Sequence, residues 1–150
     1  MARAIELAIE NVRSGRGGPF AAVLVSGGRV IASGANLVTS TNDPTAHAEI
    51  VAIRAACAAL GTFRLDGCEI YTTCEPCPMC VGAIYWARLR AVYFGSTAAD
   101  ATAAGFDDAA IYRQIGMPAA DREIRFGQIM RDAALACFRE WREKPDRVNY

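Results

Sequence analysis

Apolar positions near the start of the chain recur first with a helical period and then in short runs of strand length. Residues 2–13 carry apolar side chains at helical spacing, and a glycine-rich loop at 14–19 ends the pattern. The apolar runs 20–25 and 30–34 have the length of strands, and the two glycines between them suit a tight hairpin because glycine adopts positive φ angles. A helix followed by a β-hairpin is therefore expected.

The middle of the chain alternates helices with strands. A helix is expected to begin at Pro44, with Asp43 as its N-cap, and to end at Gly61. The elements expected after it are a strand at 68–73, a helix at 79–87 opened by Pro78, and a strand at 91–95. Alternation of this kind predicts an α/β protein.

The last third of the chain has a weaker pattern. The alanine-rich stretch 96–117 predicts a short helix and a loop, and residues 123–130 alternate like a final, weaker strand. Residues 132–144 predict an amphipathic helix that Pro145 ends. No internal repeat or linker interrupts the chain. We therefore predict one domain over residues 1–150, in which a mixed sheet of about five strands is covered by helices on both faces.

The composition agrees with a compact protein, and its net charge limits the kinds of partner that are expected. Of the 150 residues, 53% are hydrophobic and 21% are charged, which suits a chain with a buried core. Sixteen basic and sixteen acidic residues leave a formal net charge of zero. Proteins that bind long polyanions usually carry a basic surplus. A small, weakly charged substrate is therefore favoured over a nucleic acid.

The six cysteines are expected to be thiols rather than disulfides. Charge begins at the third residue, so no signal peptide is indicated, and no apolar run reaches membrane-spanning length. We therefore expect a cytoplasmic protein with no membrane partner. In a reducing compartment, clustered cysteines are more often metal ligands than disulfides.

Two short motifs carry the candidate chemistry. His47 is the only histidine, Glu49 follows two residues later, and Cys77 and Cys80 are spaced as C-x-x-C. Imidazole nitrogen and thiolate sulfur suit Zn²⁺. Pro78 places both cysteines in the first turn of a helix, where the helix dipole lowers thiol pKa values. Three ligands leave a fourth position for water, whose pKa zinc lowers towards neutrality. One catalytic zinc ion per subunit is expected.

Glu49 is expected to transfer protons rather than to bind the metal. Residues two apart on a helix do not share a face, so Glu49 is poorly placed as a ligand beside His47. As a general base it would take a proton from water, and as a general acid it would hand one to a leaving amine. The alternative is a closed structural site that Cys74 completes. Cys74 ends a predicted strand, however, and does not share the helical turn of the cysteine pair.

Together these motifs resemble the cytidine and deoxycytidylate deaminase superfamily, whose signature joins H-x-E to P-C-x-x-C. The resemblance implies a three-layer α/β/α cytidine-deaminase-like fold and hydrolysis of an exocyclic amine. Further stretches are similar to the bacterial guanine deaminases of that superfamily: GGPF at 17–20, NDPTAHAE at 42–49, GAIYWA at 82–87, GFDD at 105–108 and the C-terminal tyrosine.

The resemblance also implies where the base binds. Asn36 would hydrogen-bond the purine ring, and Phe20 would pack against it. Asp108 would accept hydrogen bonds from N1–H and the 2-amino group of guanine, whereas adenine has no donor at N1. Trp86 would line the site. Tyr150 would reach a site from a C-terminal segment that this family exchanges between the subunits of a homodimer.

The implied activity is the conversion of guanine and water to xanthine and ammonia. By pattern alone, Phe20 also fits a core strand, Asn36 a turn, and Asp107 or Asp108 a helix cap. The alternatives are another deaminase of this fold, acting on cytosine, a nucleoside or tRNA adenosine, and a non-catalytic binding domain stapled by zinc. The neutral charge argues against tRNA, and Asp108 with the terminal tyrosine argues for guanine.

Overall fold

The computed structural model describes residues 1–150, which form two compact units, residues 1–110 and residues 111–150. All the strands belong to the first unit, and the second contains helices and irregular segments. The first unit is therefore the part in which the expected α/β architecture is found.

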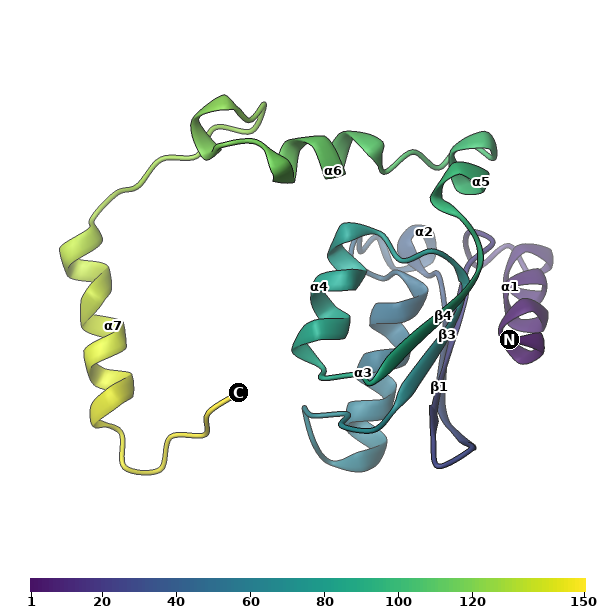
Figure 1. The fold of residues 1–150 in the computed structure, drawn as a ribbon, viewed down its shortest axis with the longest axis horizontal. Coiled ribbons are helices and arrows are strands. Elements are labelled where there is room, and N and C mark those ends of the chain that lie inside the picture. Colours follow the sequence, from purple (N-terminus) through teal and green to yellow (C-terminus); the bar gives the residue numbers. More distant parts are fainter. The chain divides into compact units, whose positions relative to one another are not determined.

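A mixed four-stranded sheet forms the centre of the first unit (Figure 1). Its order is β2-β1-β3-β4; β1 runs antiparallel to both β2 and β3, and β3 runs parallel to β4. The bounds are β1 (Ala21–Ser26), β2 (Arg29–Ala35), β3 (Glu69–Cys74) and β4 (Ala91–Ser96). The hairpin between β1 and β2 turns at Gly27 and Gly28, whose φ angles of 54° and 77° are positive, as expected.

The fifth strand expected at residues 123–130 does not form, and that prediction is wrong. The segment is irregular. Its alternating pattern suits a strand, but the second unit, to which it belongs, has no other strand with which it could exchange backbone hydrogen bonds. Alternation alone therefore overstated the size of the sheet.

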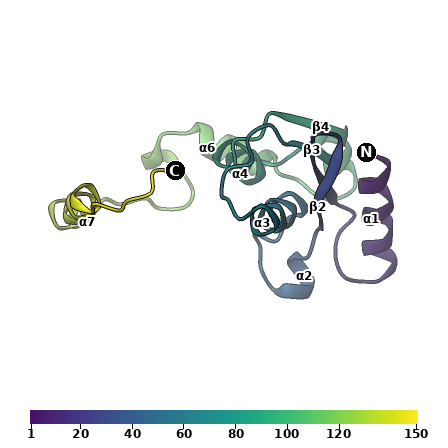
Figure 2. The same ribbon diagram turned by 90° about the horizontal axis from the view of Figure 1, so that it is seen from below.

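Helices cover both faces of the sheet and make three layers (Figures 1 and 2). Helix α1 (Ala2–Arg13) lies on one face, and α3 (Ala48–Leu60) and α4 (Pro78–Trp86) lie on the other. Between the sheet and α3, the fully buried Leu24 and Ile70 pack with the small residues Ala52 and Ala56. The expected three-layer α/β/α fold is confirmed.

Gly34 allows helix α3 to lie against β2 at backbone distance. A Cβ atom at this position would lie 2.5 Å from the carbonyl oxygen of Ala48 and 2.6 Å from the amide nitrogen of Ala52. Only glycine fits without moving the helix. Because this contact involves the first turn of α3, it also fixes the residues at the start of that helix.

Helix α3 begins at Ala48, four residues later than the expected start at Pro44. Asp43 does not cap it. Its Oδ1 instead accepts hydrogen bonds from the backbone N–H of Thr45 at 2.8 Å and from the Thr45 hydroxyl at 2.7 Å. This local turn competes with helix formation, as aspartate often does. The N-cap position falls to His47.

Short helices complete both units. Helix α2 (Val38–Thr41) and α5 (Ala98–Ala103) belong to the first unit, and α6 (Ala109–Gly116) crosses the boundary between the units. The second unit adds the 3₁₀ turn η1 (Ala119–Asp121) and α7 (Arg131–Glu143), close to the helix expected at 132–144. None of the helices has the length and apolarity needed to cross a membrane.

Candidate metal centre and active site

Three predicted ligand residues meet where helices α3 and α4 begin. His47 is the N-cap of α3, Cys77 is the N-cap of α4, and Cys80 follows in the first turn of α4, which Pro78 opens as expected. The ligand atoms of these three residues all lie within 4.8 Å of one another. Two helix N-termini thus bring together residues from distant parts of the chain.

The separations within this group match a zinc site. Nδ1 of His47 lies 3.6 Å from Sγ of Cys77 and 3.7 Å from Sγ of Cys80. Usual zinc–nitrogen and zinc–sulfur bond lengths in a tetrahedron place such donors about 3.6 Å apart. The nitrogen–sulfur donor set and its spacing therefore fit Zn²⁺.

The thiols and the imidazole perturb one another strongly. A hydrogen bond from Cys80, followed by one from His47, lowers the pKa of Cys77 to about 4. The hydrogen bond with Cys77, together with burial, raises the pKa of Cys80 well above its usual range. The hydrogen bond with Cys77 also raises the pKa of His47. Negative charge therefore concentrates at Cys77, where a divalent cation would neutralise it.

Cys74 does not join the group of three. Its thiol donates instead to the carbonyl oxygen of Thr97 at 3.6 Å, and burial raises its pKa. The group that could hold a metal consists of His47, Cys77 and Cys80 alone. This arrangement favours a three-ligand centre over a closed structural site.

Glu49 lies beside the cysteine pair in the first turn of α3. Only 8% of the residue is exposed, and its Oε2 lies 3.4 Å from Sγ of Cys80. Burial raises the pKa of its carboxyl group. A raised pKa moves a carboxyl group towards neutral pH, which suits acid–base chemistry.

A cavity of about 590 Å³ opens beside this group and is large enough for a small ligand. His47, Glu49 and Cys77 form part of its wall. Among the residues expected to bind a base, the cavity is lined by Phe20, Asn36 and Asp108. The structure therefore brings these three together with the metal group, although they come from separate segments.

The other two expected base-binding residues lie elsewhere. Trp86 ends helix α4, is 65% exposed and does not line the cavity. Tyr150 belongs to the second unit. The roles expected for both residues stay predictions.

The two aspartates that the sequence could not separate have different surroundings. Asp107 Oδ1 accepts a hydrogen bond from the backbone N–H of Ala109 at 2.8 Å, at the start of α6. Asp108 is half-buried, and burial raises the pKa of its carboxyl group, with a further contribution from nearby Cys77. Both residues line the cavity, but the Asp107 carboxylate is engaged by the helix, so Asp108 is the better candidate for binding a ligand.

Sequence reasoning missed further residues of the cavity wall, among them Phe106 and Glu75. Phe106 meets Phe20 edge to face, with ring centroids 4.8 Å apart and an interplanar angle of 83°. Glu75 Oε2 accepts a hydrogen bond from the backbone N–H of Ala98 at 2.9 Å, where α5 begins. Phe106 belongs to the GFDD stretch and could have been found there, whereas no sequence signal marked Glu75.

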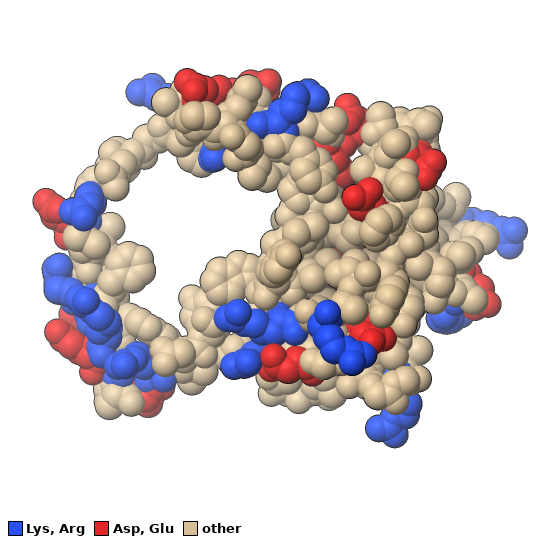
Figure 3. Space-filling model, viewed as in Figure 1, with Lys and Arg blue, Asp and Glu red and all other residues tan.

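The charged surface agrees with a small ligand. On the face in view in Figure 3, basic side chains of the first unit stand beside acidic ones and form no continuous basic stripe. Several exposed basic side chains of the first unit form ion pairs, such as Arg64 with Asp66 at 2.9 Å and Arg54 with Asp43 at 3.7 Å. Each pair offsets the positive charge of its arginine.

Comparisons with known proteins point to one family. Residues 1–96 match the family model described as the cytidine and deoxycytidylate deaminase zinc-binding region. The chain is 53% identical to a guanine deaminase of Bacillus subtilis over 99% of this chain and 95% of the relative. The X-ray structure of guanine deaminase from Bacillus subtilis is similar with a TM-score of 0.97 at 52% identity, covering 99% of this chain and 95% of that one.

A relative with a different named activity matches less of the chain. A tRNA-specific adenosine deaminase of Agrobacterium fabrum is 55% identical, but only over 78 residues, which are 52% of this chain and 51% of the relative. The similarity to that relative is therefore confined to about half of each chain.

Proposed function

The chain belongs to the cytidine and deoxycytidylate deaminase family, and on that premise we propose that it is a zinc-dependent guanine deaminase. It converts guanine and water to xanthine and ammonia. The observation that carries this function is the similarity to a guanine deaminase along nearly the whole chain. The cavity that joins the metal group to Asp108 supports it.

Zinc is the cofactor of this domain. His47, Cys77 and Cys80 would hold the ion, because their donor atoms are of the right type and spacing. When bound, zinc supplies a Lewis acid that makes water nucleophilic near neutral pH. The remaining chemistry depends on side chains of the chain itself.

Glu49 moves the protons of the reaction. Hydrolysis forms a bond between the water oxygen and C2 of guanine and breaks the bond from C2 to the amine nitrogen. Glu49 takes a proton from the water and delivers one to the leaving amine, so that ammonia departs. Its burial beside the cysteine pair supports this role, because bulk water does not compete for the proton.

The cavity wall offers what guanine needs for recognition. The Asp108 carboxylate accepts hydrogen bonds from the donors on the N1 and 2-amino edge. Asn36 bonds the purine ring, and the edge-to-face pair of Phe20 and Phe106 packs against its flat surface. Adenine has no donor at N1, so this edge discriminates against it.

We further propose that the active protein is a homodimer in which the C-terminal segment, including Tyr150, is exchanged between subunits. In the second unit, helix α7 presents Phe138, which is 65% exposed, and Trp141, which is 38% exposed. Exposed aromatic residues on an amphipathic helix favour a protein partner. Trp86 lines the site in this arrangement. The single domain over residues 1–150 and the cytoplasmic location stay predictions.

One assay tests the proposed activity. Zinc-loaded protein is incubated with guanine, cytosine, adenine and guanosine, and ammonia release is measured. We expect release from guanine and little from the others. Activity on cytosine but not on guanine would contradict the proposal in favour of another deaminase. A zinc-replete protein inert towards every base would instead favour a non-catalytic binding domain.

A further inference from the structure

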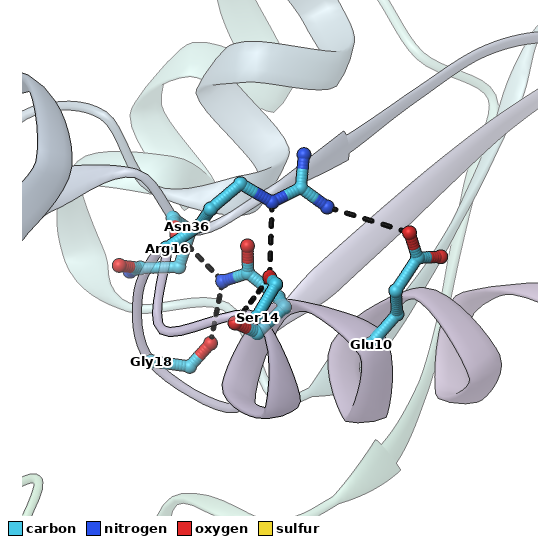
Figure 4. Close-up of polar contacts among 6 residues, drawn as sticks. Glu10, Ser14, Arg16, Gly18 and Asn36 are labelled. Carbon is cyan, nitrogen blue, oxygen red and sulfur yellow. Dashed lines mark hydrogen bonds and ion pairs between the residues drawn. The ribbon is translucent and has the colours of Figure 1, made fainter.

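Asn11 is a fully buried polar residue on the inner face of helix α1. Its Nδ2 donates to the carbonyl oxygen of Gly18 at 3.0 Å and to that of Asn36 at 2.8 Å (Figure 4). Both acceptors are carbonyl oxygens, so the side chain must present its NH₂ group to them. One amide therefore joins the first helix, the glycine loop and the end of strand β2.

Burying the side chain of Asn11 costs free energy, and the need to pack helix α1 against the sheet does not by itself explain why a polar residue is placed there. Its Oδ1 is buried without a hydrogen-bond partner. The other buried residues of this helix are Ala4 and Ala8, which fill the same face without polar atoms. An unpaired buried oxygen is unfavourable. Satisfying the carbonyl groups of Gly18 and Asn36 is what offsets it.

The loop after helix α1 folds around Asn11. The backbone carbonyl oxygen of Asn11 accepts from the amide N–H of Arg16 at 3.2 Å and from the hydroxyl of Ser14 at 3.1 Å. Arg16 is held in turn by Ser14 at 3.1 Å and by an ion pair with Glu10 at 3.6 Å (Figure 4). These contacts lead the chain directly into Gly17 and Gly18, whose backbone lines the cavity.

Gly17 makes this approach possible. A Cβ atom at Gly17 would overlap the carbonyl oxygen of Asn36 and lie 3.1 Å from Nδ2 of Asn11. The loop, the asparagine amide and the Asn36 carbonyl group therefore share a space that admits no additional carbon atom.

Asn36 is fixed at three points. Its backbone N–H donates to the carbonyl oxygen of Phe20 at 2.9 Å, and its backbone carbonyl oxygen accepts from Asn11. Its side-chain Oδ1 accepts from the amide N–H of Val38 at 3.3 Å. The NH₂ group of Asn36 is then left for an acceptor in the cavity. The hydrogen bond from Asn11 ties this residue to helix α1.

We propose that Asn11 is a positioning residue for the base. It holds Asn36 and the Gly17–Gly18 wall so that Nδ2 of Asn36 meets an acceptor of the purine ring. This inference rests on the proposed function for its substrate. The residues of the metal group and Glu49 belong to the starts of α3 and α4, which Asn11 does not hold. A change at Asn11 should therefore weaken binding of the base and leave proton transfer unchanged.

Steady-state kinetics separate these two effects. We expect Asn11→Ala, which removes one hydrogen bond to Asn36, to raise KM for guanine by roughly fivefold with kcat within about twofold and zinc content unchanged. Asn11→Asp should be at least as harmful, because an isosteric carboxylate cannot donate to two carbonyl groups. Glu6→Ala is the matched control: it removes an exposed ion-pair partner of Arg3 on the same helix and should leave KM unchanged. A normal KM in Asn11→Ala would overturn the proposal, as would a loss confined to kcat.

A double-mutant cycle distinguishes positioning from general damage to the fold. If Asn11 acts through the Asn36 side chain, Asn11→Ala should raise KM little further in an Asn36→Ala background. Equal effects in both backgrounds would show that Asn11 does not act through Asn36. If Asn11→Ala does not fold, Gly17→Ala displaces the same carbonyl group from the other side and should give the same increase in KM.

The NMR resonances of the Asn36 side chain test the role of Asn11 without any substrate. The side-chain amide resonances of Asn36 should shift or broaden in Asn11→Ala and stay in place in Glu6→Ala. Unchanged resonances in Asn11→Ala would overturn the positioning role even in an active guanine deaminase. A wild-type protein that is loaded with zinc but inert on guanine would contradict the proposed function, and these resonances would still test the role of Asn11.

Discussion

At the scale of single residues, chemistry in this protein depends on which neighbour each side chain meets. Asp107 and Asp108 are adjacent, of the same type and both on the cavity wall, yet Asp107 accepts a hydrogen bond at the start of helix α6 and Asp108 is the more buried. Cys74 and Cys77 are both buried, yet only Cys77 lies with His47. Residue type supplies the candidates, and spatial neighbours assign their roles.

Replacing Glu49 by glutamine should separate metal binding from catalysis. Glu49→Gln keeps the shape of the side chain but cannot take a proton from water. We expect zinc content to stay at the wild-type level and kcat to fall by roughly 10²–10⁴-fold. Atomic absorption and ammonia release measure the two quantities. A variant that turns over at a near-normal rate would remove Glu49 from the chemistry.

The aspartate pair allows a matched comparison. Asp108→Asn replaces an acceptor for two donors with a group that has only one acceptor atom, and we expect kcat/KM for guanine to fall by roughly 10- to 100-fold. Asp107→Asn keeps an oxygen that can cap helix α6, so its kcat/KM should stay near the wild-type value. The roles assigned here are wrong if Asp107→Asn is the more damaging change.

At the scale of elements, the site depends on where two helices begin. Local chemistry placed the start of α4 correctly, because Pro78 suits the first helical position. The start of α3 was misjudged, because Asp43 and Thr45 form their own turn before the helix. That turn and the close contact at Gly34 place the first turn of α3 against the sheet.

The turn at Asp43 predicts a dependence of stability on pH. The side-chain and backbone hydrogen bonds from Thr45 lower the pKa of Asp43 below its ordinary value of 3.8. A carboxyl group whose pKa is lower in the folded state than in the unfolded state stabilises the fold above the unfolded value, and it loses this contribution as pH falls through the folded value. Wild type should therefore exceed Asp43→Ala in unfolding free energy at neutral pH.

Urea unfolding at several pH values measures this difference. The advantage of wild type over Asp43→Ala should be constant above about pH 5 and should shrink below the ordinary aspartate pKa. Asp66→Ala is a useful control, since the pKa of Asp66 is also lowered, by Arg64, but outside the turn that precedes α3. A difference for Asp43→Ala that does not change with pH would mean that ionisation of Asp43 plays no part.

At the scale of the whole molecule, the sheet and its covering helices account for the first unit, and the second unit carries exposed aromatic side chains. The first unit contains the metal group and the cavity. The family model covers residues 1–96, whereas the similarity to guanine deaminase extends over 99% of the chain. Much of the similarity to guanine deaminase therefore lies outside the part that the family model covers.

Removing the end of the chain should test this division. A protein truncated after Arg147 lacks Tyr150 but retains the metal group. We expect normal zinc content and a fall in guanine turnover of roughly 10- to 100-fold, because a contact that orients the base is lost. Sedimentation should still show a dimer, since α7 is intact. Full activity of the truncated protein would rule out a role for Tyr150.

Much of this protein could be predicted from the sequence because the signals are local. Proline and glycine set turns and helix ends through their own φ angles, and His47, Cys77 and Cys80 specify a zinc donor set by their atom types. Helical and strand periods indicated the α/β architecture for the same reason. Each of these properties depends on the type and the spacing of residues along the chain.

Tertiary structure decided what depends on contacts between distant segments. Whether residues 123–130 pair as a strand depends on an available sheet edge, and the role of Phe106 depends on meeting Phe20. Asn11 looks like an ordinary polar position in the first helix, yet it binds a carbonyl group 25 residues away. Hydrogen bonds and van der Waals contacts act over a few ångströms, so only the folded chain shows which residues share them.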